Sequence, residues 1–182
     1  MTTATQELTG MFTADPYHSS FLFAVQHMRV SRFRATFGDV EARLECDESG
    51  ISLEGRARVA SISITDPPQF REHVVNGEEF FDGRKHPEIV FRSTRVEIAE
   101  DGGVAVDGEL EIKGIARPVT ATGTYQPQVE DPYGGSRTAI ELRTVIDRRD
   151  WGMNWQMPLP AGGNALGYEV ELTVGLELIK QG

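Results

Sequence analysis

Along most of the chain, apolar and polar residues alternate at every second position, which is the pattern of a β-strand with one buried and one exposed face. Near the C-terminus, for example, Val170, Leu172 and Val174 share one face, whereas Glu169 and Glu171 occupy the other. Segments of this kind predict eight or nine strands, at residues 8–15, 19–28, 32–46, 51–64, 88–98, 104–112, 115–126, 136–148 and 166–179.

Short runs of Gly, Asp and Pro separate these segments and supply the residues that tight turns require. Asp101-Gly102-Gly103 and Lys113-Gly114 are typical of the turns that join antiparallel neighbours. Long and numerous strands joined by hairpins favour a closed barrel, because closure removes the exposed sheet edges. The sequence therefore predicts an all-β protein, an extended antiparallel eight-stranded β-barrel, with a β-sandwich as the alternative.

The alternation is interrupted at about residues 67–81, where the sequence predicts a short helical insertion. Asp66 is expected to cap the helix, with two prolines in the first turn. Phe70 and Val74 are four residues apart and would share one helical face, and Asn76 precedes the glycine that would end the helix. A second short turn would follow over residues 78–81. We expect this insertion to lie across one end of the barrel.

Composition and charge narrow the class of protein. The 182 residues include 18 Lys and Arg and 28 Asp and Glu, a formal net charge of −10, which argues against nucleic acid and anionic membrane surfaces as main partners. The longest apolar run, residues 21–25, is far shorter than the roughly 20 residues of a transmembrane helix. Cys46 is the single cysteine, and the N-terminal residues do not resemble a secretory signal. We therefore expect a cytoplasmic protein with no transmembrane segment.

Asp15, His18, Ser19 and His27 are the residues that invite a catalytic interpretation. A nucleophile and its base must be in hydrogen-bond contact, but nine residues of strand between the two histidines would span roughly 30 Å. We therefore expect no catalytic residue and interpret Asp15 and His18 as making hydrogen bonds in a turn at a barrel end. The four histidines form no close pair, so no metal site is expected.

Large apolar side chains recur at same-face positions and are the candidate binding residues. Phe21, Phe23, Val25 and His27 share one face of a predicted strand. Two further groups are Trp151, Met153 and Trp155, and, near the helical insertion, Phe70, Phe80, Phe81, Ile89 and Phe91. Packed core is one interpretation of these residues. The other is an adaptable apolar cavity, since a barrel of eight strands can hold one small ligand.

Six ordered blocks of sequence carry a family resemblance. The first is Asp15-Pro-Tyr-His18-Ser19-Ser20-Phe-Leu-Phe23-Ala-Val25-Gln-His27. The later blocks include His86-Pro87-Glu-Ile-Val-Phe91 and Arg148-Arg-Asp150-Trp151-Gly152. Together the blocks resemble the YceI-like polyisoprenoid-binding proteins from about Met11 to Ile179. One departure is Val74, where the family pattern has a histidine; here His73 stands one place earlier.

The resemblance implies one lipocalin-like barrel domain over residues 1–182, with an apolar tunnel for a polyprenyl chain or an isoprenoid quinone. It implies that Phe21, Phe23, Val25, His27, Phe80, Phe81, Ile89 and Phe91 line this tunnel; the other candidate binding residues rest on their apolar pattern. It also implies that the partner is an isoprenoid or another long-chain amphiphilic lipid. No other cofactor is expected. We rank non-catalytic binding, sequestration or transport of such a lipid first. The alternatives are an enzyme acting on a small apolar substrate through His18, His27 or Asp15, and a structural barrel that forms a homodimer.

Overall fold

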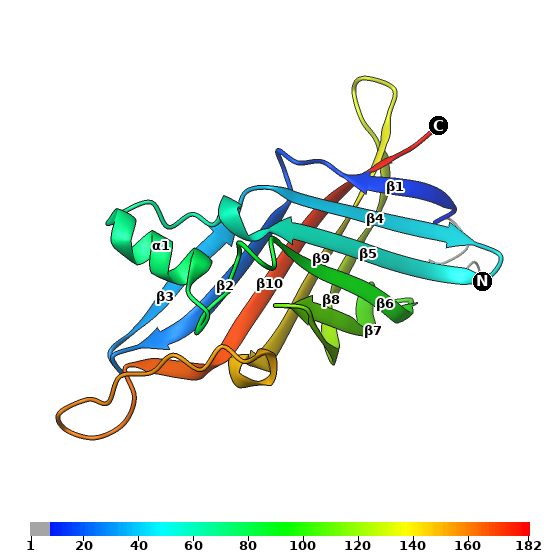
Figure 1. Cartoon of the computed structure of the whole chain (residues 1–182). Helices are drawn as coiled ribbons and strands as arrows, with labels where there is room; N and C mark the ends of the chain where they lie inside the picture. Colours follow the sequence, from blue (N-terminus) through cyan, green and yellow to red (C-terminus); the bar gives the residue numbers. More distant parts are fainter. Residues whose placement is uncertain (1–7) are drawn as a thin grey trace.

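The computed structural model describes residues 8–182 and consists mainly of antiparallel strands (Figure 1). The strands are β1 (Gly10–Ala14), β2 (Ser20–His27), β3 (Ser31–Phe37), β4 (Val40–Asp47), β5 (Gly50–Arg58), β6 (Glu88–Ile98), β7 (Gly103–Ile112), β8 (Ile115–Glu130), β9 (Ser136–Asp147) and β10 (Leu166–Lys180). One α-helix, α1 (Pro68–Asn76), and two 3-10 turns, η2 (Val59–Ser61) and η3 (Arg148–Trp151), complete the described elements.

The sheet closes into a barrel through β10. Its order is β1-β4-β5-β6-β7-β8-β9-β10-β2-β3, and an additional β1–β10 pairing completes the ring. Both β1 and β2 pair with the same edge of β10, β2 along residues 166–175 and β1 along residues 178–180. Because β1 with β2, and β3 with β4, each act as one long interrupted strand, the ten segments form an eight-stranded antiparallel barrel. The predicted fold class is confirmed.

The predicted strand at residues 32–46 is wrong, because it divides into β3 and β4. The division falls at Gly38 and Asp39, which bond to the end of β5 and the turn beyond it: the Gly38 N–H donates to the Ser61 carbonyl (3.1 Å), and the Arg58 N–H donates to the Asp39 carbonyl (3.0 Å). On one side of the division β3 pairs with β2, and on the other β4 pairs with β5. Because of the break, β4 pairs with β5, whereas β3 follows β2 away from β5.

The α-helix lies beside β3, at the end of the barrel where β3 has separated from β5 (Figure 1). The predicted insertion at 67–81 is confirmed in position, but the helix ends at Asn76 and non-helical turns follow. The predicted cap is wrong: Pro67 takes the N-cap position and no side chain caps the helix, because Asp66 lies one residue too early. The Arg71 guanidinium instead secures the helix by donating to the carbonyls of Ala60, Ile62 and Ile64.

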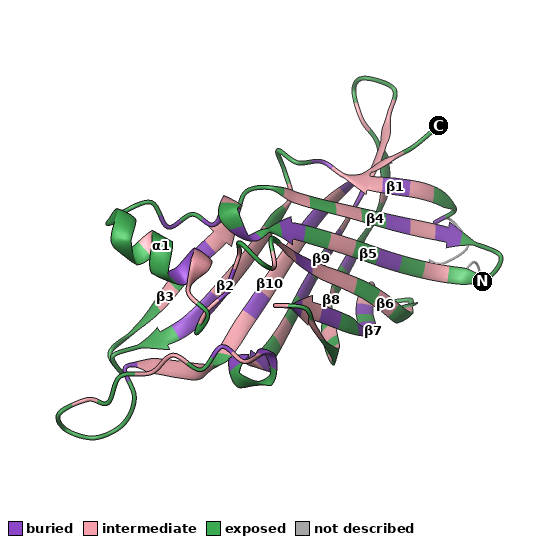
Figure 2. Cartoon of the chain, viewed as in Figure 1, coloured by how far each residue is buried: buried purple, intermediate pink, exposed green. Residues whose placement is uncertain are grey.

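The interior contains two apolar clusters, and burial alternates along the strands that enclose them (Figure 2). At the end away from α1, Phe12, Leu44, Ile140 and Leu178 are fully buried. The cluster at the α1 end includes Phe37, Ile89 and other residues of the barrel wall, and it surrounds a cavity. One half of the barrel is therefore packed with side chains, and the other half is hollow.

An ion cluster holds the break between β1 and β2. The Arg137 guanidinium donates to Asp15 (2.8 Å), Glu177 (2.7 Å) and Asp131 (3.0 Å), and His18 Nδ1 donates to Asp15 Oδ2 (2.9 Å). The expected role of Asp15 and His18 in a barrel-end turn is confirmed. The hydrogen bonds from His18 and then from Arg137 hold the pKa of the Asp15 carboxyl well below its usual range, and the same contact with Asp15 raises the pKa of His18.

The depressed pKa of Asp15 gives a pH-dependent stability prediction. A carboxylate whose pKa is lower in the folded protein stabilises the fold at pH values above its ordinary pKa of about 4. That contribution is lost as the pH falls towards the lower pKa of the folded state. Asp15→Asn is therefore expected to lower Tm by several degrees at pH 7, and the difference from the unmodified protein should shrink progressively below pH 4. Thermal melts from pH 7 to pH 3 measure it.

The matched control is Asp39→Asn, which removes a half-exposed carboxylate whose ion pair in the described part of the chain is with Arg58 on the surface. Its Tm should stay close to that of the unmodified protein at both ends of the pH range. A Tm difference for Asp15→Asn that is constant or grows towards pH 3 would contradict the assigned role of Asp15.

Candidate functional site

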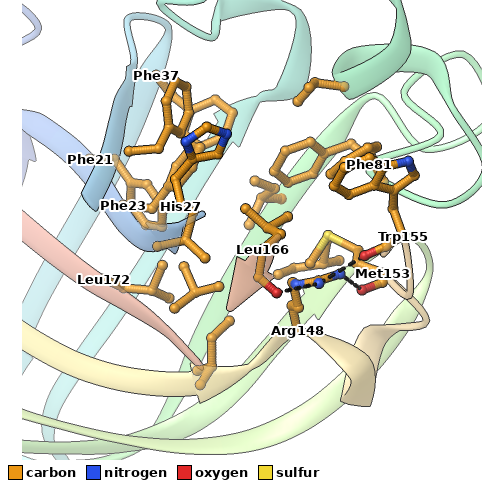
Figure 3. A pocket seen from close by; sticks show the side chains of 18 of the residues that line it. Phe21, Phe23, His27, Phe37, Phe81, Arg148, Met153, Trp155, Leu166 and Leu172 are labelled. Carbon is orange, nitrogen blue, oxygen red and sulfur yellow. Dashed lines mark hydrogen bonds between the residues drawn. The ribbon is translucent and has the colours of Figure 1, made fainter. Parts of the chain in front are cut away.

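The hollow half of the barrel contains an apolar cavity of about 270 Å³, here called the main cavity (Figure 3). Its wall is built from inward-facing positions of β2, β3, β6, β7, β9 and β10, together with α1 and the segments around residues 80 and 155. The lining residues are Phe21, Phe23, Val25, His27, Phe33, Phe37, Phe70, His73, Val74, Phe80, Phe81, Ile89, Leu110, Ile112, Ile146, Arg148, Met153, Trp155, Leu166, Val170 and Leu172. Such a lining suits a ligand whose surface is largely hydrocarbon.

The structure brings ten of the twelve candidate binding residues together around this cavity. They are Phe21, Phe23, Val25, His27, Phe70, Phe80, Phe81, Ile89, Met153 and Trp155. The β2 residues converge because alternate side chains of one strand face the barrel interior. Their position at the cavity wall is an observation, and their contact with a ligand stays a prediction.

Two candidate residues lie elsewhere. Phe91 lines a second, smaller cavity rather than the main one. Trp151 lines neither and is packed in the core: its side chain is 2% exposed and its indole N–H donates to the Leu110 carbonyl (3.0 Å). Its alternation with Met153 and Trp155 is misleading because Trp151 belongs to the 3-10 turn η3, where side chains do not follow the two-residue period of a strand.

Several lining residues were not predicted as part of a site. Leu110, Ile146, Val170 and Leu172 belong to alternating segments, so the sequence marks them as buried. Burial alone does not distinguish the wall of a cavity from a packed core. The missing information is the register between strands, which places Leu172 beside Phe23.

The opening of the main cavity is marked by lining residues with exposed side chains, His27, Phe70 and His73. Aromatic rings surround it. The rings of Phe80 and Trp155 stack with centroids 5.5 Å apart, and the His73 ring meets both edge-on at 5.1 and 6.2 Å. The mouth is therefore bordered by rings from α1, the turn after it and the segment before β10, with the polar atoms of two histidines at its edge.

Arg148 is a buried cation in the cavity wall. Its side chain is 3% exposed, and its guanidinium donates to the carbonyls of Trp155 (2.8 Å), Met153 and Leu166 (Figure 3). It also donates to the Gly167 carbonyl (2.8 Å). Burial lowers the pKa of this guanidinium. Because the four carbonyls lie on the irregular segment before β10 and on its first residues, Arg148 holds the segment that carries Met153 and Trp155 against the barrel.

The second cavity has a volume of about 90 Å³ and continues from the main cavity towards the packed half of the barrel. Phe21, Ile89, Leu110 and Leu172 line both cavities and form the partition between them. Phe91 lies beyond the partition, where its ring covers Gly108; a Cβ atom at position 108 would lie 2.5 Å from this ring. Glycine at position 108 therefore makes room for Phe91.

The residues of the alternative enzyme hypothesis do not form one site. Asp15 and His18 contact each other before β2 begins, whereas His27 is the last residue of β2 and lines the main cavity. Asp15, His18 and Glu177 also place possible metal-ligand atoms within 4.8 Å of one another. The Arg137 guanidinium already bonds to both carboxylates of that group, so their charge is compensated by the protein itself.

A closed antiparallel barrel with an apolar interior and a helix beside its mouth defines the lipocalin-like class of fold. Within that class, the YceI-like domain model matches residues 12–178, and the chain belongs to the YceI-like family. The resemblance drawn from the sequence blocks is thereby confirmed.

Three known proteins illustrate the relationship. A UPF0312 protein of Staphylococcus aureus (strain MSSA476) is 28% identical over 168 residues, which cover 91% of this chain and 95% of the relative. The structure of BcnA from Burkholderia cenocepacia superposes with a TM-score of 0.72 at 20% identity, covering 92% of this chain and 99% of BcnA. A polyisoprenoid binding domain from Saccharophagus degradans gives a TM-score of 0.70 at 11% identity, covering 96% and 100%. The two structures show a shared fold.

Among residues 8–182, no helix has both the length and the apolar character needed to cross a membrane.

Removing Arg148 should destabilise the protein more than removing its neighbour. Arg148→Met leaves buried carbonyls without a donor, so the free energy of unfolding is expected to fall by about 3 kcal/mol. The control is Arg149→Met: Arg149 is exposed, pairs with Asp147 and lies over the Tyr168 ring, and its loss should cost about 1 kcal/mol or less. Urea unfolding measures both, and equal losses would contradict the role assigned to Arg148.

Proposed function

We propose that this protein binds an isoprenoid-like lipid, a polyprenyl chain or an isoprenoid quinone, without covalent chemistry, and so sequesters or transports it. The observation that carries the proposal is the main cavity, about 270 Å³ enclosed by apolar and aromatic side chains inside a barrel that opens at one end. The structural similarity to a polyisoprenoid binding domain supports the choice of ligand class.

Burial of hydrocarbon would provide the binding energy. Each CH₂ group removed from water contributes about 0.8 kcal/mol, so a chain needs few polar contacts to be held. The adaptable side chains of Met153, Leu166 and Leu172 suit a chain with methyl branches. We place the polar end of the ligand at the mouth, where His27 and His73 are exposed, and the chain inside.

A chain longer than the main cavity would continue into the second cavity. To do so it must displace the partition of Phe21, Ile89, Leu110 and Leu172. Beyond the second cavity the interior is filled by the cluster around Phe12, Leu44 and Leu178, so the tunnel has a closed end.

The chemistry of the lining supports binding rather than catalysis. The described residues that line the main cavity include no Ser, Thr, Cys, Asp, Glu or Lys. Its one permanent cation, Arg148, is held by backbone carbonyls. Of the three candidate proton-transfer groups, His27 lines the cavity, whereas Asp15 and His18 bond to each other outside this lining.

The direct test is extraction of the natively purified protein with organic solvent, followed by mass spectrometry of the extract. We expect a prenyl lipid in the extract, or, from lipid-free protein, saturable binding of added prenyl alcohols and quinones. The proposed function is overturned if no lipid is recovered from the protein and no added prenyl chain binds to it.

An acidic residue inside the cavity should abolish binding. Phe23→Asp places a charge in the cavity wall, where it has no partner, so affinity for a prenyl chain is expected to fall by at least about 100-fold. Phe91→Asp, beyond the partition, should weaken long chains more than short ones. Fluorescence titration with prenyl alcohols of increasing length measures both effects.

The matched control is Leu22→Asp, which adds the same charge on the neighbouring residue of β2, on the outer face between Thr36 and Thr173. This variant should bind prenyl chains within about threefold of the unmodified protein, a difference of less than 1 kcal/mol. If a folded Phe23→Asp protein binds as tightly as the control, Phe23 does not contact the ligand.

A further inference from the structure

The end of the barrel at the cavity mouth differs in charge from the rest of the protein. Between residues 16 and 38 the chain has three arginines, Arg29, Arg32 and Arg34, and no Asp or Glu. From residue 151 to 168 it has no charged residue at all. Both stretches stand out in a chain in which 25% of residues are charged and the net charge is −10. Residues 1–91 and 92–182 each contain 9 basic and 14 acidic residues, so the difference is local and does not separate the two halves of the sequence.

The fold brings the two stretches together beside the cavity. The turn after β2 and the loop before β10 extend from the same end of the barrel (Figure 1). The Met28 N–H donates to the Ala165 carbonyl (2.6 Å), and Arg29 reaches the Gly162 carbonyl (3.4 Å). We call this region the tip: the turn at residues 28–30, the outward-facing Arg32 and Arg34 of β3, and the loop at residues 157–165.

The tip exposes apolar side chains among its arginines. Val30 is 85% exposed, Met157 53% and Met28 38%. Within residues 8–182, Arg29 and Arg34 bond only to backbone carbonyls, and Arg32 shares a half-exposed ion pair with Glu171. At the opposite end of the barrel, Arg137 is shared by three carboxylates, those of Asp15, Asp131 and Glu177. Acidic side chains therefore outnumber the cation there, whereas arginines predominate at the tip.

The turn at the tip also adopts an unfavourable backbone conformation. Met28 (φ 51°) and Arg29 (φ 61°) are both in the left-handed region, and the Val30 N–H donates to the His27 carbonyl (3.1 Å). Two consecutive left-handed residues favour Asn-Gly, and other side chains destabilise such a turn. The chain has Met-Arg here, which provides an apolar and a cationic side chain at the cost of stability.

We propose that the tip is a docking surface for an anionic lipid bilayer. Exposed Met and Val side chains would enter the headgroup region while the arginines contact lipid phosphates, the combination that interfacial membrane-binding segments use. The acidic opposite end would orient the molecule with its cavity mouth towards the bilayer. This surface is separate from the cavity lining, so docking and lipid binding can be tested independently.

The test is co-sedimentation with vesicles of phosphatidylcholine containing about 30 mol% phosphatidylglycerol, an anionic composition, compared with phosphatidylcholine alone. We expect binding to the anionic vesicles that weakens as salt rises from about 0.1 to 0.5 M. The triple variant Arg29→Gln, Arg32→Gln, Arg34→Gln should bind roughly 100-fold more weakly, since each arginine near an anionic surface contributes about a factor of five.

The matched control replaces three exposed arginines on the outer faces of β4 and β6, Arg43→Gln, Arg92→Gln and Arg95→Gln. It changes the net charge by the same amount and should retain vesicle binding within about threefold, because those residues lie away from the tip. Both triple variants should bind prenyl alcohol in solution as the unmodified protein does, which separates docking from the proposed function.

A second variant tests the turn itself. Met28→Asn with Arg29→Gly relieves the left-handed conformation, so Tm is expected to rise by about 2–4 °C while anionic-vesicle binding falls at least fivefold. The proposal is overturned if the folded unmodified protein does not bind anionic vesicles, or if the tip and control variants lose binding equally. It is also overturned if sedimentation of the protein without vesicles shows a dimer that the triple arginine variant of the tip disrupts. That result would make the tip a contact between copies of this chain.

Discussion

The structure depends on how one edge of β10 is shared. Residues 166–175 of that edge pair with β2 and residues 178–180 pair with β1, so the ring closes only because the chain between β1 and β2 bends without leaving the edge. The bend contains Asp15, which is 5% exposed and bonds to Arg137 from β9. A buried carboxylate with a charged partner is stable where an unpaired one is not, and the ion cluster therefore stabilises the point at which the barrel closes.

The matching break between β3 and β4 creates the functional half of the molecule. Once β3 stops following β5, the wall between them is replaced by η2, α1 and the turn that carries Phe80 and Phe81. These elements cover the opening with aromatic side chains rather than with a hydrogen-bonded strand. The closed ring at the other end leaves no comparable space, and Phe12, Leu44 and Leu178 fill it. A cavity near α1 and a packed core at the other end are thus two consequences of the same strand breaks.

Sequence reasoning succeeded for β2 and failed for Trp151 for related physical reasons. Within a strand, alternation determines which side chains share a face, so the spacing of Phe21, Phe23 and Val25 is enough to assign them to one wall. Trp151 stands in an alternating series with Met153 and Trp155, but it belongs to a 3-10 turn and is buried in the core. Arg148 belongs to one of the blocks of the family resemblance, but its place in the cavity wall was not predicted, because its role depends on carbonyls up to 19 residues away in the chain.

The sequence by itself determined the strand content, the helical insertion and the family, because alternation, turn residues and ordered motifs are local properties of the chain. The tertiary structure decided where the strands break, which buried residues border empty space and where the charges gather. Those features depend on pairing between segments that are distant in sequence, as when the turn after β2 meets the loop before β10. The sequence shows the acidic net charge of the chain. Only the fold places the arginine-bearing stretch and the uncharged stretch together at the mouth of the cavity.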